Sequence, residues 1–410
     1  MRILHLATFL QGGAGRAVTD LALQQHAGGH DVRVVASRSE TPGYGNYPAY
    51  LQSLRDARVP LLLVDSLFHR DYAANLNAVQ QIDRAIGAVP PDVIHAHAAV
   101  PAMMAMLLSG SRRDAVPVMS TMHGWSATKT PAQSETDVRV LNLVHRVATP
   151  SAHSAALLQD AGVDPGRIHV VPYGVGKELP ALSDRDERAA AEMRDARRDG
   201  RFVVACVGTV GERKRQRLLI EALGHLEDPR ACLVVFIGDG DTSALQSAAE
   251  SFGVQDSVAI HGYSAAARRL GTEADALALP SSREGQPLSI LEAFCDGTPV
   301  IASDIPELAE MIDDGENGWL FAPDSAESLA RTIEDVMHAS PLDRDHVARR
   351  ARERYRDRHA LGDMTHRYMT HYTDLAFDDR GAGFTGSMSG SDPELQGSDP
   401  ITDPVTRSRA

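Results

Sequence analysis

Two glutamates separated by seven residues are the positions with the clearest chemistry. Glu284 and Glu292 lie in SSREGQPLSILEAF, where Glu284 precedes a predicted helix and Glu292 falls more than one turn inside it. A carboxylate accepts paired hydrogen bonds, which suits the neighbouring hydroxyls of a sugar or a ribose. An acidic group ahead of a helix is also a favourable partner for the helix dipole. That alternative explains Glu284 alone and leaves Glu292 unexplained in an apolar run.

The residues between these glutamates predict an anion site. Pro287 suits the first turn of a helix, and Gly285 lets the loop pass close to a ligand. The free N–H groups and the positive dipole end near Pro287 to Ser289 would then face an anion. The stretch thus pairs an anion site with two groups that can bind hydroxyls.

Three consecutive cations follow the predicted strand at 201–209. Arg213, Lys214 and Arg215 stand between this strand and a helical segment containing LLIEAL. Lysine supplies a point charge and arginine a planar fork, so the cluster can grip a diphosphate. A solvated run of charges is the usual alternative. The position at the carboxyl end of a strand, where open parallel sheets bind ligands, favours a site.

A glycine-rich stretch, QGGAGRA at 11–17, follows the first predicted strand. Its glycines let the backbone approach a ligand, and the following helix offers free N–H groups to a phosphate or a sugar. It does not fit the dinucleotide pattern, since Val18 occupies the last position if Gly13 is the first, and it lacks the GK[ST] of a P-loop. A plain tight turn is the alternative.

Three histidines end or line predicted strands. His123, in MHGW, stands beside a glycine at a strand end and can lie open to a cleft, although a structural role fits it equally. His95 and His97 share one face of a strand. A metal site there is conceivable, but no third ligand can be assigned, so no metal is predicted.

Short apolar runs alternate with amphipathic stretches along the chain. This alternation predicts an α/β fold, in which parallel sheets are covered by helices such as 16–27 and 72–88 on both faces. The predicted strands are 1–7, 31–37, 60–65, 92–97, 116–123 and 146–151, and then 201–209, 231–239, 257–262, 276–281 and 299–303.

A polar, charged segment at 176–200 separates the two series and predicts an interdomain linker that runs into a solvated helix. We therefore expect two Rossmann-like domains, 1–175 and 176–361, facing each other across a cleft. The segment 362–377 predicts a final amphipathic helix. The segment 378–410 has few apolar residues, so we expect it to be disordered.

Composition excludes several classes of protein. The net charge of −14 argues against a nucleic-acid partner. Three cysteines without a CxxC pattern suit reduced thiols in the cytoplasm, with neither disulfides nor a zinc site. The N-terminal MRILHLA predicts a buried strand better than a signal peptide. No apolar run approaches the roughly 20 residues that span a bilayer, which leaves room for a peripheral membrane contact.

The chain resembles the retaining glycosyltransferases of family 4, which have the GT-B fold, over roughly residues 1–375. The most specific shared element is the pattern of Glu284, seven residues and Glu292. The supporting elements are the GGAG at 12–15, the MHG at 122–124, the TPSAHSAALLQDAG at 149–162 with VVPYGV at 170–175, the Lys214 loop, and the IGDGD at 237–241.

The resemblance implies that the second domain binds the nucleotide sugar, the first domain binds most of the acceptor, and the helix at 362–377 crosses back to the first domain. Glu292 would hold the ribose hydroxyls, Glu284 would face the donor sugar, and Lys214 would neutralise the departing diphosphate. His123 would lie near the anomeric carbon. The other donor contacts that it implies are Gly13 and Gly15 near the phosphates, Arg213 beside Lys214, Gly262 and Tyr263 near the base, and Gly285, Gln286, Pro287, Leu288 and Ser289 around the phosphate or sugar.

The implied reaction moves a hexose-type sugar from a nucleotide sugar, with a UDP-sugar favoured, to an acceptor hydroxyl with retention of configuration. The acceptor would be a sugar, a lipid-linked molecule or another hydroxyl compound in the synthesis of a glycan, glycolipid or polysaccharide. No cofactor and no metal are implied. The DxD pattern at 239–241 could suggest a metal, but it also occurs at 184–186 in the predicted linker.

Two positions depart from the family pattern. The arginine that often follows the glycine of the phosphate loop is Thr209, so Arg213 or Arg215 would have to replace it. The acid that the family often has after the TPS segment is lacking at Gly176. Two alternatives therefore remain: an epimerase of nucleotide sugars, which would need no acceptor, and a sugar-nucleotide binder without enzymatic activity.

Overall fold

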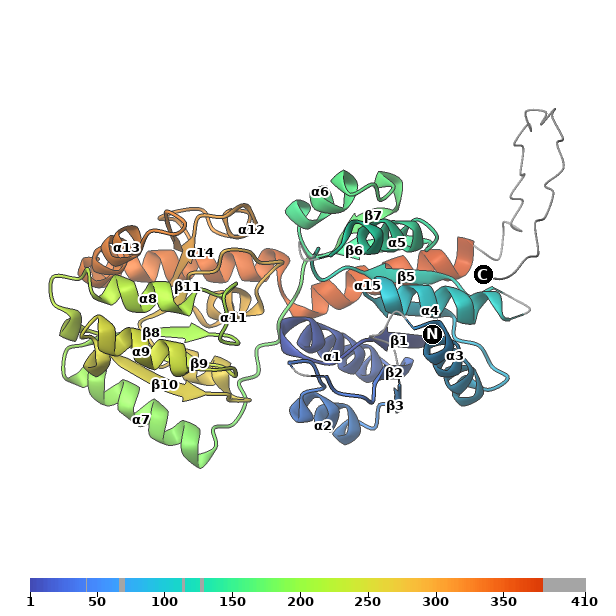
Figure 1. Ribbon diagram of the computed structural model, residues 1–410, viewed down its shortest axis with the longest axis horizontal. Coiled ribbons are helices and arrows are strands. Elements are labelled where there is room, and N and C mark those ends of the chain that lie inside the picture. The colour runs from blue at the N-terminus through green and yellow to red at the C-terminus, as the bar shows by residue number, and fades with distance from the viewer. Residues whose placement is uncertain (42, 66–70, 113–114, 126–128, 379–410) are drawn as a thin grey trace, which may run out of the picture.

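The computed structural model describes residues 1–41, 43–65, 71–112, 115–125 and 129–378. These residues form two α/β units that lie side by side and are joined at the middle of the molecule (Figure 1). The tail predicted to be disordered falls, apart from Asp378, outside the described residues. Within them, no helix is both long and apolar enough to cross a membrane.

The first unit contains a seven-stranded parallel sheet in the order β3-β2-β1-β4-β5-β6-β7. The strand order reverses between β1 and β4, so the connections after these two strands leave toward opposite faces of the sheet and open a crevice between them. The inner strands are buried on both faces, which explains their near-continuous apolar sequences. The strands are β1 Arg2–Ala7, β2 Asp31–Ser37, β3 Leu61–Val64, β4 Val93–His97, β5 Val118–Thr121, β6 Arg146–Thr149 and β7 Ile168–Val170.

Helices cover both faces of this sheet. Three of them begin with side-chain caps that satisfy free backbone N–H groups, since Asp71 accepts from Ala74 N, Thr130 from Gln133 N and Ser151 from Ser154 N. The helices are α1 Gly12–Ala27, α2 Pro48–Asp56, α3 Tyr72–Ile86, α4 Ala99–Gly110, α5 Pro131–Leu141 and α6 Ala152–Asp160.

The second unit repeats this architecture with six parallel strands in the order β10-β9-β8-β11-β12-β13. Its strand order reverses between β8 and β11, and the crevice at this reversal faces the first unit. The strands are β8 Phe202–Val207, β9 Cys232–Ile237, β10 Val258–Gly262, β11 Ala276–Leu279, β12 Val300–Ser303 and β13 Trp319–Phe321. The helices of this unit are α7 Asp184–Arg198, α8 Gln216–Leu223, α9 Ser243–Ser251, α10 Ala267–Gly271, α11 Leu288–Asp296, α12 Pro306–Ala309, α13 Ala326–His338 and α14 Pro341–Arg358. The last helix, α15 Leu361–Asp378, returns to the first unit.

The chain passes between the units twice, and the two passages pair with each other. Val175 N donates to His359 O at 3.0 Å, and Leu361 N donates to Val175 O at 3.2 Å. Gly174 is required here, because a Cβ would lie 2.5 Å from Ala360 O. The helix α15 then packs against α1 and β4 of the first unit (Figure 1). The returning helix therefore ties the C-terminal segment to the N-terminal sheet.

The predicted α/β fold with two parallel sheets is confirmed, and three details differ from the sequence-based expectations. The strands β7 and β13 have only three residues each and were not predicted from apolar runs. The helix α1 begins at Gly12, so the GGAG stretch forms its first turn and is not a loop before it. The helix α7 buries Ala190, Met193 and Ala196, and it is therefore amphipathic, not solvated all round.

Candidate functional site

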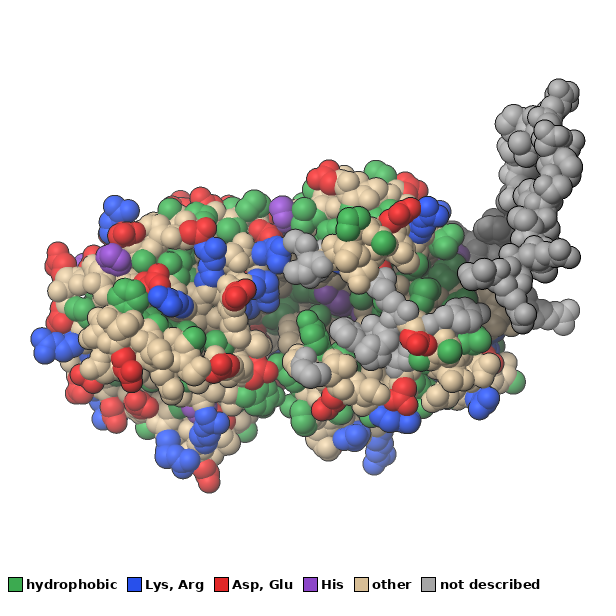
Figure 2. Space-filling view, in the orientation of Figure 1, with side chains coloured by type: hydrophobic (Ala, Val, Ile, Leu, Met, Phe, Trp, Pro, Cys, Tyr) green, Lys and Arg blue, Asp and Glu red, His purple; other side chains and the backbone are tan. Residues whose placement is uncertain are grey.

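A cleft of about 690 Å³ lies between the two units. Figure 2 shows the surface hollowed at this junction. Segments that follow β1, β5, β8, β9, β10 and β11 line it, as expected for ligand sites at the carboxyl ends of parallel strands. The cleft is therefore built from both halves of the chain.

Most of the site residues suggested by the sequence line this cleft. They are Gly13, His123, Arg213, Lys214, Tyr263, Glu284, Gly285, Gln286, Pro287, Leu288, Ser289 and Glu292. Gly15 and Gly262 do not line it. A Cβ on Gly15 would lie 2.4 Å from the carbonyl carbon of Leu10, so this glycine allows α1 to pack closely on the chain before it. Gly262 has a φ of +79° and permits the turn after β10.

Glu284 is held by two cations. Lys214 Nζ lies 2.8 Å from Glu284 Oε1, and Arg213 NH1 lies 2.9 Å from Glu284 Oε2. Burial alone would raise the pKa of this carboxyl, but the charges of Lys214 and Arg213 outweigh burial and lower it. Glu284 is therefore an ionised acceptor at the floor of the cleft at neutral pH.

The loop after β8 brings Lys214 into the cleft and turns Arg215 out of it. Gly208 has a φ of +146°, and a Cβ there would meet Lys214 Cε at 3.4 Å. Arg215 adopts a left-handed backbone with a φ of 50° and forms an ion pair with Asp324, and it does not line the cleft. The expectation of three cations gripping one diphosphate is therefore wrong for Arg215, because its side chain is directed to Asp324.

The helix α11 points its N-terminus into the cleft. Pro287 is its extended N-cap residue, and no side chain of the described chain caps the first turn. The loop before it passes so close to the segment after β5 that a Cβ on Gly285 would lie 2.7 Å from His123 O. Gln286 Oε1 accepts from Tyr173 N at 2.6 Å and fixes the loop to the other unit. This arrangement suits an anion.

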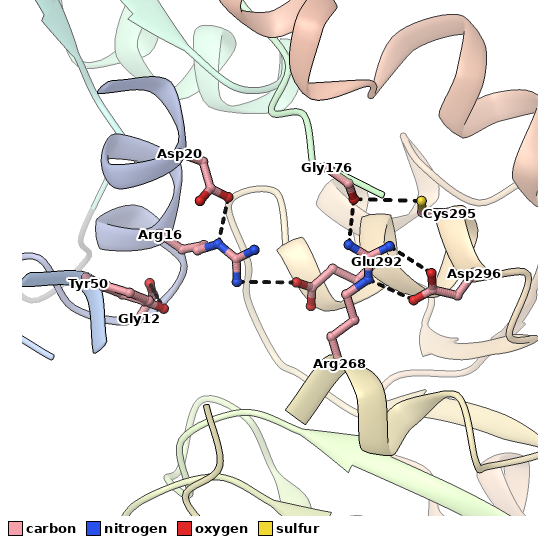
Figure 3. A network of polar contacts seen from close by, with 9 residues as sticks. All are labelled: Gly12, Arg16, Asp20, Tyr50, Gly176, Arg268, Glu292, Cys295 and Asp296. Carbon is pink, nitrogen blue, oxygen red and sulfur yellow. Dashed lines mark hydrogen bonds and ion pairs between the residues drawn. The ribbon is translucent and has the colours of Figure 1, made fainter. Parts of the chain in front are cut away.

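Glu292 lies at the meeting point of the units. Arg16 NH1, from the first turns of α1, is 3.9 Å from Glu292 Oε1, and Arg16 also donates to Asp20 at 2.6 Å (Figure 3). Arg268 lies beside Glu292 but forks onto Asp296, with distances of 2.8 Å and 2.7 Å. Burial raises the pKa of Glu292 to about 7, although Arg16 and Arg268 act in the opposite direction. The carboxyl therefore titrates near neutral pH.

His123 reaches the cleft from the segment after β5. Its Nδ1 meets the hydroxyl of Tyr173, and its Nε2 lies 3.2 Å from His97 Nδ1. Burial lowers the pKa of His123 to about 4. The ring is therefore neutral at neutral pH, and both of its nitrogens are occupied by protein partners.

Several cleft residues were not assigned a role from the sequence. Tyr47 OH donates to Asp239 Oδ2 at 2.8 Å across the cleft, and its ring meets that of Tyr263 edge to face at 5.5 Å. Arg16 and Arg268 stand on either side of Glu292. Arg16 follows the glycine-rich stretch, a signal that could have drawn attention to it. Tyr47 and Arg268 stand in no motif that could have indicated them.

The histidines of β4 also have a neighbour that the sequence analysis missed. His5 of β1 joins His95 and His97, and the possible ligand atoms of the three rings lie within 4.8 Å of one another. His5 is therefore the third possible ligand, which the sequence alone did not assign to His95 and His97. The parallel register of β1 and β4, which pairs His5 with His95, brings the rings together.

Two family models match the chain. The model described as Glycosyltransferase Family 4 matches residues 11–179, and the model described as Glycosyl transferases group 1 matches residues 189–354. The chain belongs to the family 4 glycosyltransferases. The two matches meet at the interdomain linker, and each covers one wall of the cleft.

Curated relatives of this glycosyltransferase include a putative glycosyltransferase EpsD from Bacillus subtilis. It is 27% identical over 281 residues, which cover 65% of this chain and 73% of the relative. A D-inositol 3-phosphate glycosyltransferase from Xylanimonas cellulosilytica is 32% identical over 250 residues, covering 56% of this chain and 59% of the relative. The match to the latter therefore spans less than two thirds of its length.

Solved structures share the fold of this glycosyltransferase. HepE from Anabaena in complex with UDP-glucose gives a TM-score of 0.77 at 20% identity, covering 91% of this chain and 100% of that chain. A glycosyltransferase from Rickettsia africae gives a TM-score of 0.77 at 18% identity, covering 92% of this chain and 99% of that chain. At these identities the likeness establishes the GT-B fold.

Proposed function

We propose that this glycosyltransferase moves a hexose-type sugar from a UDP-sugar to an acceptor hydroxyl with retention of configuration. The observation that carries the proposal is the cleft itself. It brings Lys214, from the loop after β8, and His123, from the first unit, to the segment that holds Glu284, the N-terminus of α11 and Glu292. The UDP-glucose complex of HepE, a protein of the same fold, supports a uridine donor.

Transfer of a sugar from a UDP-sugar requires that the departing diphosphate be stabilised. The bond between the anomeric carbon and the phosphate oxygen breaks, the acceptor oxygen bonds to that carbon, and the acceptor proton passes to the departing diphosphate. In this proposal, Lys214 and the N-terminus of α11, which both face the cleft, stabilise the negative charge that develops on the phosphate. Glu292, when ionised, can accept from the ribose hydroxyls, and Glu284 can accept from the donor sugar.

No metal or cofactor enters the proposal. The DxD carboxylates have protein partners, since Asp239 accepts from Tyr47 and Asp241 accepts from Ser243 N at 2.9 Å. Lys214 and α11 supply the positive charge that a metal would otherwise give. We further propose that the acceptor, a sugar or a lipid-linked molecule, binds on the wall formed by the first unit, and that the protein works in the cytoplasm or peripherally at a membrane.

Transfer assays with a panel of UDP- and GDP-sugars and acceptors test the proposal. We expect the wild type to transfer sugar from a UDP-sugar and the Glu292→Ala variant to lose donor binding. Glu221→Ala is the control, because Glu221 pairs with Arg217 on α8 and does not line the cleft. Normal turnover by Glu292→Ala would show that the site is assigned wrongly.

The two alternatives give different products in the same assay. An epimerase would interconvert donors without an acceptor, which chromatography of the sugar nucleotide would reveal. A binder without activity would give calorimetric donor binding but no transfer to any acceptor of the panel. Either result would contradict the proposed transfer and support the corresponding alternative.

A further inference from the structure

Five largely buried side chains form a continuous line of hydrogen bonds that ends in the cleft. Gln25 Oε1 lies 2.8 Å from His5 Nε2, and His5 Nδ1 lies 3.1 Å from His97 Nε2. His97 Nδ1 lies 3.2 Å from His123 Nε2, and His123 Nδ1 meets the hydroxyl of Tyr173. We call this set the histidine line. Its last two members, His123 and Tyr173, line the cleft.

The Tyr173 end sets the direction of each proton in the histidine line. Burial raises the pKa of the Tyr173 phenol well above its usual value, so the phenol keeps its O–H, and a buried O–H needs an acceptor. That acceptor is His123 Nδ1. His123 therefore carries its proton on Nε2 and donates it to His97 Nδ1. In the same way, His97 donates from Nε2 to His5 Nδ1, and His5 donates from Nε2 to Gln25 Oε1. All three rings are therefore protonated on Nε2.

The far end of the histidine line is closed. Gln25 is 1% exposed and His5 is fully buried, and an amide neither takes up nor releases a proton near neutral pH. The line therefore orients rings and cannot carry protons from the cleft to solvent. Burial also lowers the pKa of His5 to about 4 and that of His97 well below its usual value, so these rings stay neutral.

We propose that His97 and His5 are positioning residues that hold His123 as a neutral ring with its Nε2–H turned away from the donor sugar. The inference rests on the proposed function in one respect, which is that His123 lies beside that sugar. Positive charge develops at the anomeric carbon as a glycosidic bond breaks. A charged or freely turning imidazole beside this carbon would oppose that charge.

A metal held by the same imidazoles is a competing use of the cluster. His95 stands beside the histidine line, with its ring 4.1 Å from that of His97. Both ring nitrogens of His95 already have partners, Thr121 and Tyr372, and those of His5 and His97 are engaged within the line. A metal needs unprotonated nitrogens and would break these bonds. The hydrogen-bonded arrangement needs no such change.

Two substitutions at His97 separate positioning from simple packing. His97→Asn places an amide near the former Nδ1 and keeps an acceptor for His123. His97→Gln places its amide near the former Nε2, which keeps the partner of His5 but removes the acceptor of His123. Both variants replace an imidazole with an amide, so a purely structural role of His97 gives no reason for opposite effects on His123.

The readouts are the tautomer of His123 and the kinetics of the full chain. In ¹⁵N-histidine NMR, with the His123 signal assigned by its loss in His123→Phe, we expect an unprotonated Nδ1 and a protonated Nε2 in the wild type and in His97→Asn. With UDP-glucose as donor, we expect His97→Gln to lower kcat by about 10- to 100-fold with little change in KM. His97→Asn should stay close to the wild type.

Several results would overturn the inference. They are a wild-type His123 protonated on Nδ1, equal kinetic loss in both variants, or a purified protein that holds one zinc per chain on unprotonated imidazoles. Failure of the proposed function is distinguishable, because a wild type that transfers no sugar would still report its tautomer. If both variants fail to fold, the tautomer of His123 in the wild type still tests the inference by itself.

Discussion

The two glutamates of the cleft have opposite electrostatic settings. Lys214 and Arg213 keep the pKa of Glu284 low, whereas burial raises that of Glu292 to about 7. The sequence predicted both carboxylates as binding groups from their spacing. It could not predict this difference, because the burial that raises the pKa of Glu292 depends on how the two units pack around this side chain.

The raised pKa of Glu292 predicts pH-dependent donor binding. Glu292 must be ionised to accept from ribose hydroxyls, and its ionised fraction falls about tenfold for each pH unit well below its pKa of about 7. We therefore expect the affinity for UDP-glucose to fall as the pH drops from 8 to 5.5. Calorimetry should show this decline in the wild type, and Glu292→Gln should bind weakly at every pH. An unchanged wild-type affinity across this range would contradict the role.

Neighbouring cations in the loop after β8 should differ sharply in importance. Lys214 lies in the cleft, whereas Arg215 pairs with Asp324. We expect Lys214→Met to lower kcat by about 10²- to 10³-fold, the range for loss of a group that stabilises developing charge. Arg215→Met should remain within a fewfold of the wild type. Equal losses would mean that Arg215 turns to the phosphate after all.

At the scale of elements, apolar runs predicted the strands well because buried parallel strands need continuous Val, Ile and Leu. β7 and β13 were not predicted, because a strand of three residues is too short to show a hydrophobic pattern. The start of α1 was misplaced because its glycines are typical of loops, yet they lie in the first turn. Close packing of Gly15 on Leu10 explains that start, and this contact is not visible in the sequence.

The approach of the α11 loop to β5 gives a prediction about Gly285. A Cβ at this position would lie 2.7 Å from His123 O, so Gly285→Ala must displace the loop or the segment after β5. We expect kcat to fall by about 100-fold, as for a misplacement of about 1 Å. Gly110→Ala is the control, because an added Cβ there meets nothing within 4 Å. Full activity of Gly285→Ala would show that the loop is not in place during catalysis.

For the whole molecule, the sequence predicted two Rossmann-like units but not how they touch. Contacts such as Tyr47 with Asp239 join residues 192 positions apart, and no local pattern encodes them. Tyr173 N and Gln286 form another contact across the cleft. These links hold the two walls together, so the relative placement of the units decides which groups meet a donor.

Removal of one such link should loosen the cleft. Tyr47→Phe keeps the ring against Tyr263 and removes only the hydroxyl that bonds to Asp239. We expect the free energy that holds the two units in contact to fall by about 1 kcal/mol, the usual contribution of one hydrogen bond. Faster hydrogen exchange around 238–241 and a larger radius of gyration without ligand would report it. Identical exchange and size would show that this hydrogen bond does not hold the units together.

A crystal structure of the chain with UDP tests the central claim most directly. The account predicts one UDP in the cleft, with its ribose hydroxyls on the carboxylate of Glu292. Its diphosphate should lie between Lys214 and the N-terminus of α11. A UDP bound outside the cleft, or bound there without contact to Glu292 and Lys214, would contradict the account.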